Sequence, residues 1–253
     1  MAPNTPIAAA GAGRRSRWPA RLDLAQSASG VLLALFMWAH MFFVASILLG
    51  KDAMWTVARF FEGYFLFGRA YPWMVSLAVA GVLVLIVVHA GLALRRFPAS
   101  FRQFRDFRTH AATLRHGDTG LWPWQVFTGF AMFFLASPHL AVMLTRPDRI
   151  GPFASADRVW SEHFWPIYLL LLFAVEIHGG VGLYRAFVKW AGPGPDGRWR
   201  ARLKRLKWVL TAFFLILGLA TLAAYMRIGI EHRDRYGEPY VPTHLQAPAD
   251  AAQ

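Results

Sequence analysis

Five long stretches without charge, separated by short basic segments, constrain the fold of this chain more than any other feature. With Glu176 as the single charged exception, they are Leu24–Gly50, Ala70–Leu94, Thr119–Thr145, His163–Tyr184 and Trp208–Met226. Their lengths are 27, 25, 27, 22 and 19 residues, and about 20 apolar residues suffice for a helix to cross the hydrocarbon core of a bilayer. No other open backbone conformation satisfies its hydrogen bonds in lipid. We therefore predict an all-α integral membrane bundle of five transmembrane helices.

The distribution of lysine and arginine predicts the orientation of these helices. The segments before the first stretch, between the second and third, and between the fourth and fifth carry 18 of the 27 basic residues, and the other segments carry 9. By the positive-inside rule the richer side is cytoplasmic, so an odd number of spans leaves the C-terminus in the periplasm of a bacterial inner membrane. The formal net charge of +13 is then explained by topology, and we expect no nucleic-acid partner.

The same division separates three regions. Residues 1–20 form an N-terminal cytoplasmic segment, residues 21–230 the membrane domain, and residues 231–253 a periplasmic tail. We expect poor order in residues 1–20 and after Tyr236, and no internal repeat stands out. The chain has no cysteine, which excludes disulfides, thiol nucleophiles, Cys-ligated iron–sulfur clusters and covalently attached c-type haem.

Four of the nine histidines lie inside the predicted helices, one in each of the first four. His89 and His178 are six and seven residues from the next cytoplasmic arginine, which places both about 10 Å from that edge. His40 and His139 lie roughly 10 to 16 Å from the opposite edge. Paired imidazoles on facing helices suit a b-type haem, which needs no cysteine. We therefore predict two haems b between the first four helices, ligated by His89 with His178 and by His40 with His139.

A plainer explanation exists for a single intramembrane histidine, which often only forms a hydrogen bond to a neighbouring helix. Four histidines that sort into two levels are not expected from chance contacts, and this favours haem. Small residues that would leave room for a flat macrocycle are Gly81, Gly129, Gly179, Gly180 and Gly182, although glycine is also common at ordinary helix contacts. The remaining histidines, expected at the surface, are His110, His116, His163, His232 and His244.

Four segments carry a resemblance to a known family. They are LDLAQSASGVLLALFMWAHMFFVASILLG (22–50), HAGLALRRFPASFRQFRDFRTH (89–110), RHGDTGLWPWQVFTGFAMFFLASPHLAVML (115–144) and FAVEIHGGVGLYRAFVKW (173–190). Nearly all of residues 20–230 resembles the dihaem cytochrome b subunit of quinol:fumarate reductases, the large single-chain membrane anchor of the succinate dehydrogenase and fumarate reductase superfamily. The resemblance implies the same two haem pairs, a quinol site near the outer haem, and a flavoprotein and an iron–sulfur subunit on the cytoplasmic side. It is compatible with a dimer of such heterotrimers.

The sequence departs from that family pattern at Pro138, directly before the ligand His139. A proline removes a backbone donor and can kink a helix. We therefore expect Pro138 to affect the orientation of the His139 imidazole.

Glu62 is the candidate base for quinol oxidation, a reaction that must release two protons. It lies in the outer segment between the first two helices, among Phe60, Phe61, Tyr64 and Phe65. Such an aromatic setting suits a quinone ring and raises the pKa of a carboxyl by desolvation. A solvated glutamate in an interfacial aromatic belt is the alternative. The resemblance favours the base, because the quinol-site glutamate of the family matches Glu62.

Glu176 is the second candidate for proton chemistry. It precedes His178 by two residues, so at about 100° per residue the two side chains point about 200° apart. Glu176 is therefore not a haem ligand. The resemblance implies a proton path here that offsets the charge moved by the electrons, and we assign Glu176 as its relay. A neutral glutamate hydrogen-bonded to a neighbouring helix is the alternative.

Candidate contacts for the haem propionates lie at the membrane edges. Lys189 follows His178 by eleven residues, which places it on the same helix face and about 16 Å nearer the cytoplasm. The resemblance implies that Gln26, Ser27 and Trp122 join it. Arg158, in the outer loop, is a further cofactor-binding candidate. Lysine and tryptophan at helix ends are also ordinary interfacial anchors.

These residues lead to one functional prediction. The chain oxidises menaquinol near the outer face and passes electrons through two haems b to partner subunits that reduce fumarate to succinate. The alternatives are succinate oxidation by the same architecture, the cytochrome b anchor of a hydrogenase or formate dehydrogenase, and a haem-free proton-coupled transporter using Glu176 and His178. Against the transporter, the five stretches show no paired Gly- or Pro-broken helices of the kind that mark transporter repeats.

Overall fold

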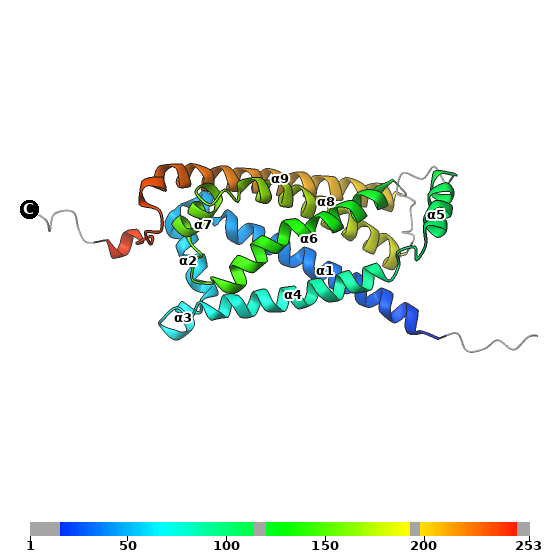
Figure 1. Cartoon of the computed structure of the whole chain (residues 1–253), viewed down its shortest axis with the longest axis horizontal. Helices are drawn as coiled ribbons and strands as arrows, with labels where there is room; N and C mark the ends of the chain where they lie inside the picture. Colours follow the sequence, from blue (N-terminus) through cyan, green and yellow to red (C-terminus); the bar gives the residue numbers. More distant parts are fainter. Residues whose placement is uncertain (1–15, 114–119, 193–197, 247–253) are drawn as a thin grey trace, which may run out of the picture.

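The structure is a computed structural model that describes residues 16–113, 120–192 and 198–246 (Figure 1). Within these ranges all regular structure is helical. Five helices are long and apolar enough to cross a membrane: α1 Trp18–Ala45, α4 Trp73–Leu94, α6 Leu121–Thr145, α8 Trp165–Trp190 and α9 Trp199–His232. The predicted all-α bundle of five transmembrane helices is confirmed.

The observed helices extend beyond the uncharged stretches from which they were predicted. α9 begins nine residues before Trp208, because the Arg-, Lys- and Leu-rich segment that precedes this residue consists of good helix formers and continues the helix past the apolar core. α1 begins at Trp18, inside the expected N-terminal segment, with Pro19 in its first turn, where a missing N–H costs no helical hydrogen bond. The first charged residue beyond an apolar stretch therefore does not mark the end of the helix.

Four of the long helices form a closed ring. α1 packs against α4, α4 against α6, α6 against α8, and α8 against α1. α9 packs outside this ring, on α8 and α1, and lies along one side of the bundle in Figure 1. The ring contains the helices that carry His40, His89, His139 and His178.

The outer surface of the ring is apolar. On α4, Leu77, Val84 and Val87 are each about two-thirds exposed, and none of the residues of this helix is buried. An exposed apolar surface of this extent marks a contact with lipid or with another protein, and the length and apolar composition of α4 favour lipid. The same helix therefore meets lipid on one side and the histidine-lined interior on the other.

Short helices cover the two ends of the bundle (Figure 1). At one end, called the outer end below, are η1 Ser46–Leu49, α2 Lys51–Phe61, α3 Tyr64–Phe67 and α7 Pro152–Trp160, and at the inner end is α5 Phe101–Thr113. A buried apolar cluster of the outer end comprises Ile47, Met54, Ala156, Val159 and Tyr225. Gly229 lets α9 approach α7 closely, since a Cβ there would lie 2.5 Å from Cβ of Trp160. The outer end is thus a packed cap.

The described part of the C-terminal segment, which ends at residue 246, is packed against this cap, contrary to the expectation of poor order after Tyr236. It contains η2 Arg233–Arg235 and η3 Thr243–Leu245. Asp52, in the first turn of α2, accepts hydrogen bonds from the Tyr240 hydroxyl (2.7 Å) and the Thr243 backbone N–H (3.0 Å). These hydrogen bonds lower the pKa of Asp52 because they stabilise the carboxylate. Residues 1–15 and 247–253, for which poor order was also expected, lie outside the described residues.

Candidate functional site

The inner pair of histidines lies between α4 and α8, which are diagonally opposite each other in the ring. The ring centroids of His89 and His178 are 6.4 Å apart. Nδ1 of His89 lies 3.2 Å from the backbone oxygen of Gln26, and Nδ1 of His178 lies 2.9 Å from that of Gln125. A carbonyl oxygen only accepts hydrogen bonds, so Nδ1 is the protonated nitrogen in both rings. Each Nε2 is left with a lone pair, as a metal ligand requires.

The outer pair lies between α1 and α6, the other diagonal. The ring centroids of His40 and His139 are 6.0 Å apart. Phe36 stacks on His40 at 5.9 Å, and the Tyr168 hydroxyl lies 3.4 Å from Nδ1 of His139. α6 continues through Pro138 to Thr145, so the proline does not prevent His139 from facing its partner.

The spacing within each pair fits a metal ion held between two imidazoles. With metal–nitrogen bonds of about 2 Å and about 1 Å from a ring nitrogen to the ring centre, the two ring centres should lie about 6 Å apart. The measured separations are 6.4 and 6.0 Å. In the part of the chain that the structure describes, no group of three or more His, Cys, Asp or Glu could hold a metal ion. Each pair therefore suits a metal whose other donors come from a porphyrin.

Two glycines make room for the inner imidazoles. A Cβ at Gly30 would lie 2.8 Å from Cε1 of His89, and one at Gly129 would lie 3.0 Å from Cε1 of His178. Of the glycines expected beside a macrocycle, only Gly129 adjoins one of the four histidine rings. Gly180 instead faces Thr211 of α9, where a Cβ would lie 2.5 Å from the hydroxyl oxygen, because it is on the side of α8 that packs on α9.

The inner edge of the bundle carries the expected propionate contacts, and one of them, Lys189, pairs with Asp23. Nζ of Lys189 lies 3.3 Å from one oxygen of this carboxylate, Arg95 lies 2.7 Å from the other, and Arg96 also pairs with it. Half-buried on the same end of α1 are Gln26 and Ser27, and Trp122 of α6 lies against the ring of Phe97 at 6.3 Å. Lys189 therefore contacts an aspartate that the sequence did not single out.

Glu62, the C-cap of α2, is only 1 % exposed. Its carboxylate lies 2.5 Å from Nη1 of Arg59. Burial raises the pKa of Glu62, and the Arg59 charge opposes that rise. The predicted burial is present, although two of the aromatic neighbours in sequence, Phe60 and Phe65, are themselves more than half exposed.

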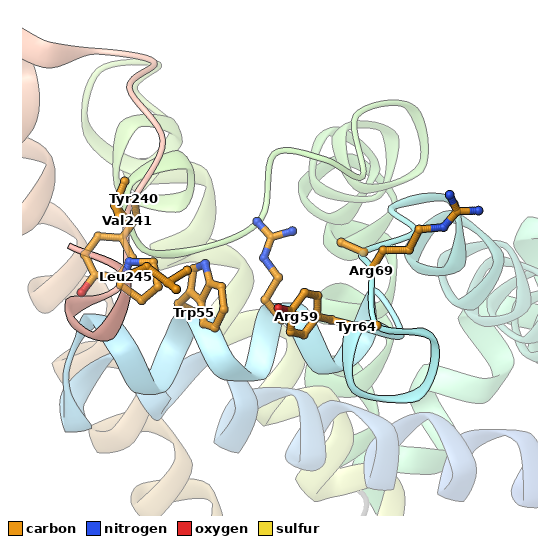
Figure 2. A pocket seen from close by; sticks show the side chains of 10 residues that line it. Trp55, Arg59, Tyr64, Arg69, Tyr240, Val241 and Leu245 are labelled. Carbon is orange, nitrogen blue, oxygen red and sulfur yellow. The ribbon is translucent and has the colours of Figure 1, made fainter. Parts of the chain in front are cut away.

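Arg59 also lines a pocket of the outer cap, which Figure 2 shows. The pocket is bordered by Trp55 and Tyr64 from the α2 and α3 region and by Tyr240 and Leu245 of the C-terminal segment. Arg59 lies over the Trp55 ring at 5.6 Å. One guanidinium thus connects a surface pocket with the buried carboxylate.

Glu176 is 1 % exposed and lies on the side of α8 opposite to the inner histidines. The Trp38 indole of α1 is its hydrogen-bond partner, and Trp38 stacks on Phe214 of α9 at 5.1 Å. The Oε1 atom of Glu176 is buried without a partner among the described residues. Glu176 therefore faces the contact of α1, α8 and α9, as the 200° estimate required.

Arg158 is buried in α7 and is close to the outer pair. It is hydrogen-bonded to Tyr168, whose hydroxyl lies beside Nδ1 of His139, and it donates to the backbone oxygen of Arg149. Its Nε is buried without a partner among the described residues. A buried guanidinium at the outer histidines has the chemistry needed to bind a carboxylate.

Comparisons with known proteins agree with this geometry. Residues 101–219 match the family model described as succinate dehydrogenase/fumarate reductase transmembrane subunit. The chain is 51% identical over 224 residues to the fumarate reductase cytochrome b subunit of Wolinella succinogenes, covering 87% of each chain. It is 50% identical over 218 residues to the protein of the same name from Helicobacter pylori strain J99, covering 85% of this chain and 84% of the relative. The chain belongs to the family of fumarate reductase cytochrome b subunits. As a member of this family it is a multi-pass membrane protein, and the hydrogenase-anchor and transporter alternatives are wrong.

A short repeated pattern adjoins the inner histidines and was not predicted to be important from the sequence alone. Residues 26–30 and 125–129 both read Gln-x-x-(Ser/Thr)-Gly, and each is followed ten residues after the glycine by a histidine of the outer pair. In both copies the glutamine carbonyl and the glycine adjoin an inner histidine. The hydroxyls of Ser29 and Thr128 also lie 3.1 and 3.5 Å from Nδ1 of His89 and His178. The conclusion that no internal repeat stands out overlooked this pattern.

His232 was expected at the surface, and that expectation is wrong. It is 1 % exposed, and its Nδ1 lies 2.9 Å from Asp157, which also accepts the Gly237 backbone N–H at 3.0 Å. Phe153 stacks on its ring at 4.0 Å. His163 and His244 are exposed as expected, and the side chains of His110 and His116 lie outside the described residues. Because Asp157 precedes Arg158, the pair fixes the part of α7 that carries this arginine.

Proposed function

We propose that this subunit oxidises menaquinol near its outer end and passes the electrons through two haems b to an iron–sulfur subunit and a flavoprotein at its cytoplasmic end, where fumarate is reduced to succinate. The observation that carries this proposal is the occurrence of two diagonal histidine pairs with centroid separations of 6.4 and 6.0 Å. The name shared by the relatives, fumarate reductase cytochrome b subunit, supports the haem type and the partner reaction.

The two pairs form levels along one electron path. His40 is ten residues beyond Gly30 on α1, and Gly30 adjoins His89 of the inner pair. Ten residues of helix correspond to about 15 Å. Haem bound at each level supplies one-electron transfer. The protein holds the imidazoles through Gln26, Gln125 and Tyr168, and the apolar walls of the ring keep water away.

The proton-releasing step belongs to the outer cap. Oxidation of one menaquinol releases two electrons and two protons, so each turnover needs an acceptor for the protons. Glu62 is the proposed base, because it is buried and its only described ionic partner is Arg59. Glu176 is the proposed relay for protons that move along the bundle and offset the electron charge.

The haem propionates have their own proposed contacts. Arg158 is the proposed contact for the outer haem, and the proposed contacts for the inner haem are Lys189, Gln26, Ser27 and Trp122.

The experiment that tests this function is a haem count with a turnover assay. The purified subunit should contain two haems per chain with low-spin bis-histidine spectra, and its complex should couple oxidation of a menaquinol analogue to fumarate reduction. Succinate-driven quinone reduction is measured in the same preparation, and a faster rate in that direction would replace fumarate reduction as the physiological assignment. A haem-free preparation from haem-replete cells would overturn the electron-transfer role.

A further inference from the structure

Two arginines occupy matching positions relative to the inner histidines. Arg96 follows His89 by seven residues, and Arg185 follows His178 by seven. Seven residues are about two helical turns, so each arginine lies on the side of its histidine and about 10 Å nearer the inner end. Past the end of α4 the helical turn continues, with the Arg96 N–H bonded to the Ala93 oxygen at 3.0 Å. Both guanidinium groups therefore lie at the inner rim of the inner histidine pair.

The two arginines differ in their partners. Arg96 pairs with Asp23, which lies three residues before Gln26 on α1. Three residues before Gln125 on α6, the corresponding position is Trp122, which has no carboxylate. In the described part of the chain, Arg185 donates instead to the neutral side-chain oxygen of Gln125 at 2.6 Å. The first copy of the pattern is thus preceded by a carboxylate that pairs with Arg96, whereas the second copy is preceded by a tryptophan.

The inner rim carries an excess of positive charge. Arg96 lies close enough to Arg185 for their charges to interact. Arg95, Arg96 and Lys189 share the single carboxylate of Asp23, so Arg185 adds a cation to a cluster that is already positive. Arginine forms strong, often bidentate hydrogen bonds with carboxylates, and a dicarboxylate group that enters between α4 and α8 would balance this charge.

We propose that Arg185, with Arg96, binds the propionate carboxylates of the haem held by His89 and His178. Gln125 connects the two functions on α8, because its backbone oxygen accepts the His178 Nδ1–H and its side-chain oxygen accepts the Arg185 guanidinium. Arg185 and Arg96 join the inner propionate contacts proposed above, Lys189, Gln26, Ser27 and Trp122. The assignment rests on the proposed dihaem function.

The test compares Arg185→Gln with Arg205→Gln, which removes an exposed cation of α9 at the same end of the bundle. In a redox titration, the step that is lost in His89→Ala identifies the inner haem. In Arg185→Gln, transfer of the inner haem to apomyoglobin should be about 10- to 100-fold faster, which is the loss expected for one charge-assisted hydrogen bond. Its midpoint potential should become more negative, because a nearby cation favours the reduced haem. The outer haem and Arg205→Gln should match the wild type.

Unchanged transfer rate and unchanged inner potential in Arg185→Gln would overturn the proposal, and so would equal changes in both haems. If Arg185→Gln retains no haem, Arg185→Lys, which keeps the positive charge, is used to test the proposal. With haem labelled with carbon-13 at its propionates, label-sensitive carboxylate bands in redox difference infrared spectra should shift in Arg185→Lys, and unshifted bands would contradict the assignment. A wild-type subunit with fewer than two haems would refute the proposed function itself, so the two failures are distinguishable.

Discussion

At the scale of single residues, Glu62 has the environment that a quinol base needs. Glu62→Gln keeps the size and most hydrogen-bonding capacity but cannot take up a proton, so menaquinol-driven haem reduction should fall by about 100-fold or more. Both haems should remain bound, and fumarate reduction from an artificial donor to the partner subunits should continue. Rapid mixing with a menaquinol analogue, followed at the haem absorbance bands, measures the effect. Wild-type reduction kinetics would show that Glu62 is structural.

The ion pair with Arg59 makes a separate pH prediction for the same residue. Burial raises the pKa of Glu62 and the Arg59 charge opposes that rise, so removing the cation in Arg59→Gln should raise the pKa further. A base works only when ionised, and the rate of quinol oxidation therefore falls as pH drops through its pKa. The acidic limb of the pH–rate profile should move to higher pH in Arg59→Gln. An acidic limb that stays in place would mean that another group titrates.

Glu176 should behave differently, since it faces α1 and α9. Glu176→Gln should keep both haems and the initial rate of haem reduction, while steady turnover slows because protons no longer accompany the electrons. The comparison of the first reduction phase with steady turnover in one preparation separates these effects. Normal steady turnover would leave Glu176 as a helix contact hydrogen-bonded to Trp38.

At the scale of helices, α1 and α6 each hold an inner histidine with a carbonyl and a glycine. A Cβ at Gly129 would lie 3.0 Å from the His178 ring, so Gly129→Val should displace this imidazole and remove the inner haem selectively. Gly91→Val on α4 is the matched control, because no atom lies within 4 Å of a Cβ built there. Haem-to-protein ratios and redox titrations measure the outcome. Retention of both haems in Gly129→Val would refute the close packing of α6 against His178.

The same scale shows which features the sequence could predict. The five spans and the histidine levels depend on apolar length and on rise per residue, which are local properties, and the predicted helices are present. The short cap helices α2 and α7 are amphipathic segments of about ten residues whose stability comes from tertiary packing. Burial of His232 depends on Asp157, 75 positions away, and no local pattern indicates such a contact. Sequence therefore predicted which histidines face each other better than it predicted the residues that position them.

At the scale of the whole molecule, the orientation in the membrane is a prediction that the chain makes easy to test. The start of α1 and the C-terminal segment lie at opposite ends of the bundle (Figure 1), and the excess of lysine and arginine is at the end where α1 starts. That end should be cytoplasmic, because basic segments resist translocation, and the partner subunits would then meet the inner haem. The chain has no cysteine, so each introduced cysteine is a unique label. In intact cells a membrane-impermeant maleimide should label Glu238→Cys and should label Lys204→Cys only after lysis. The opposite pattern would place the Glu62 region in the cytoplasm and reverse the direction of the proposed electron path.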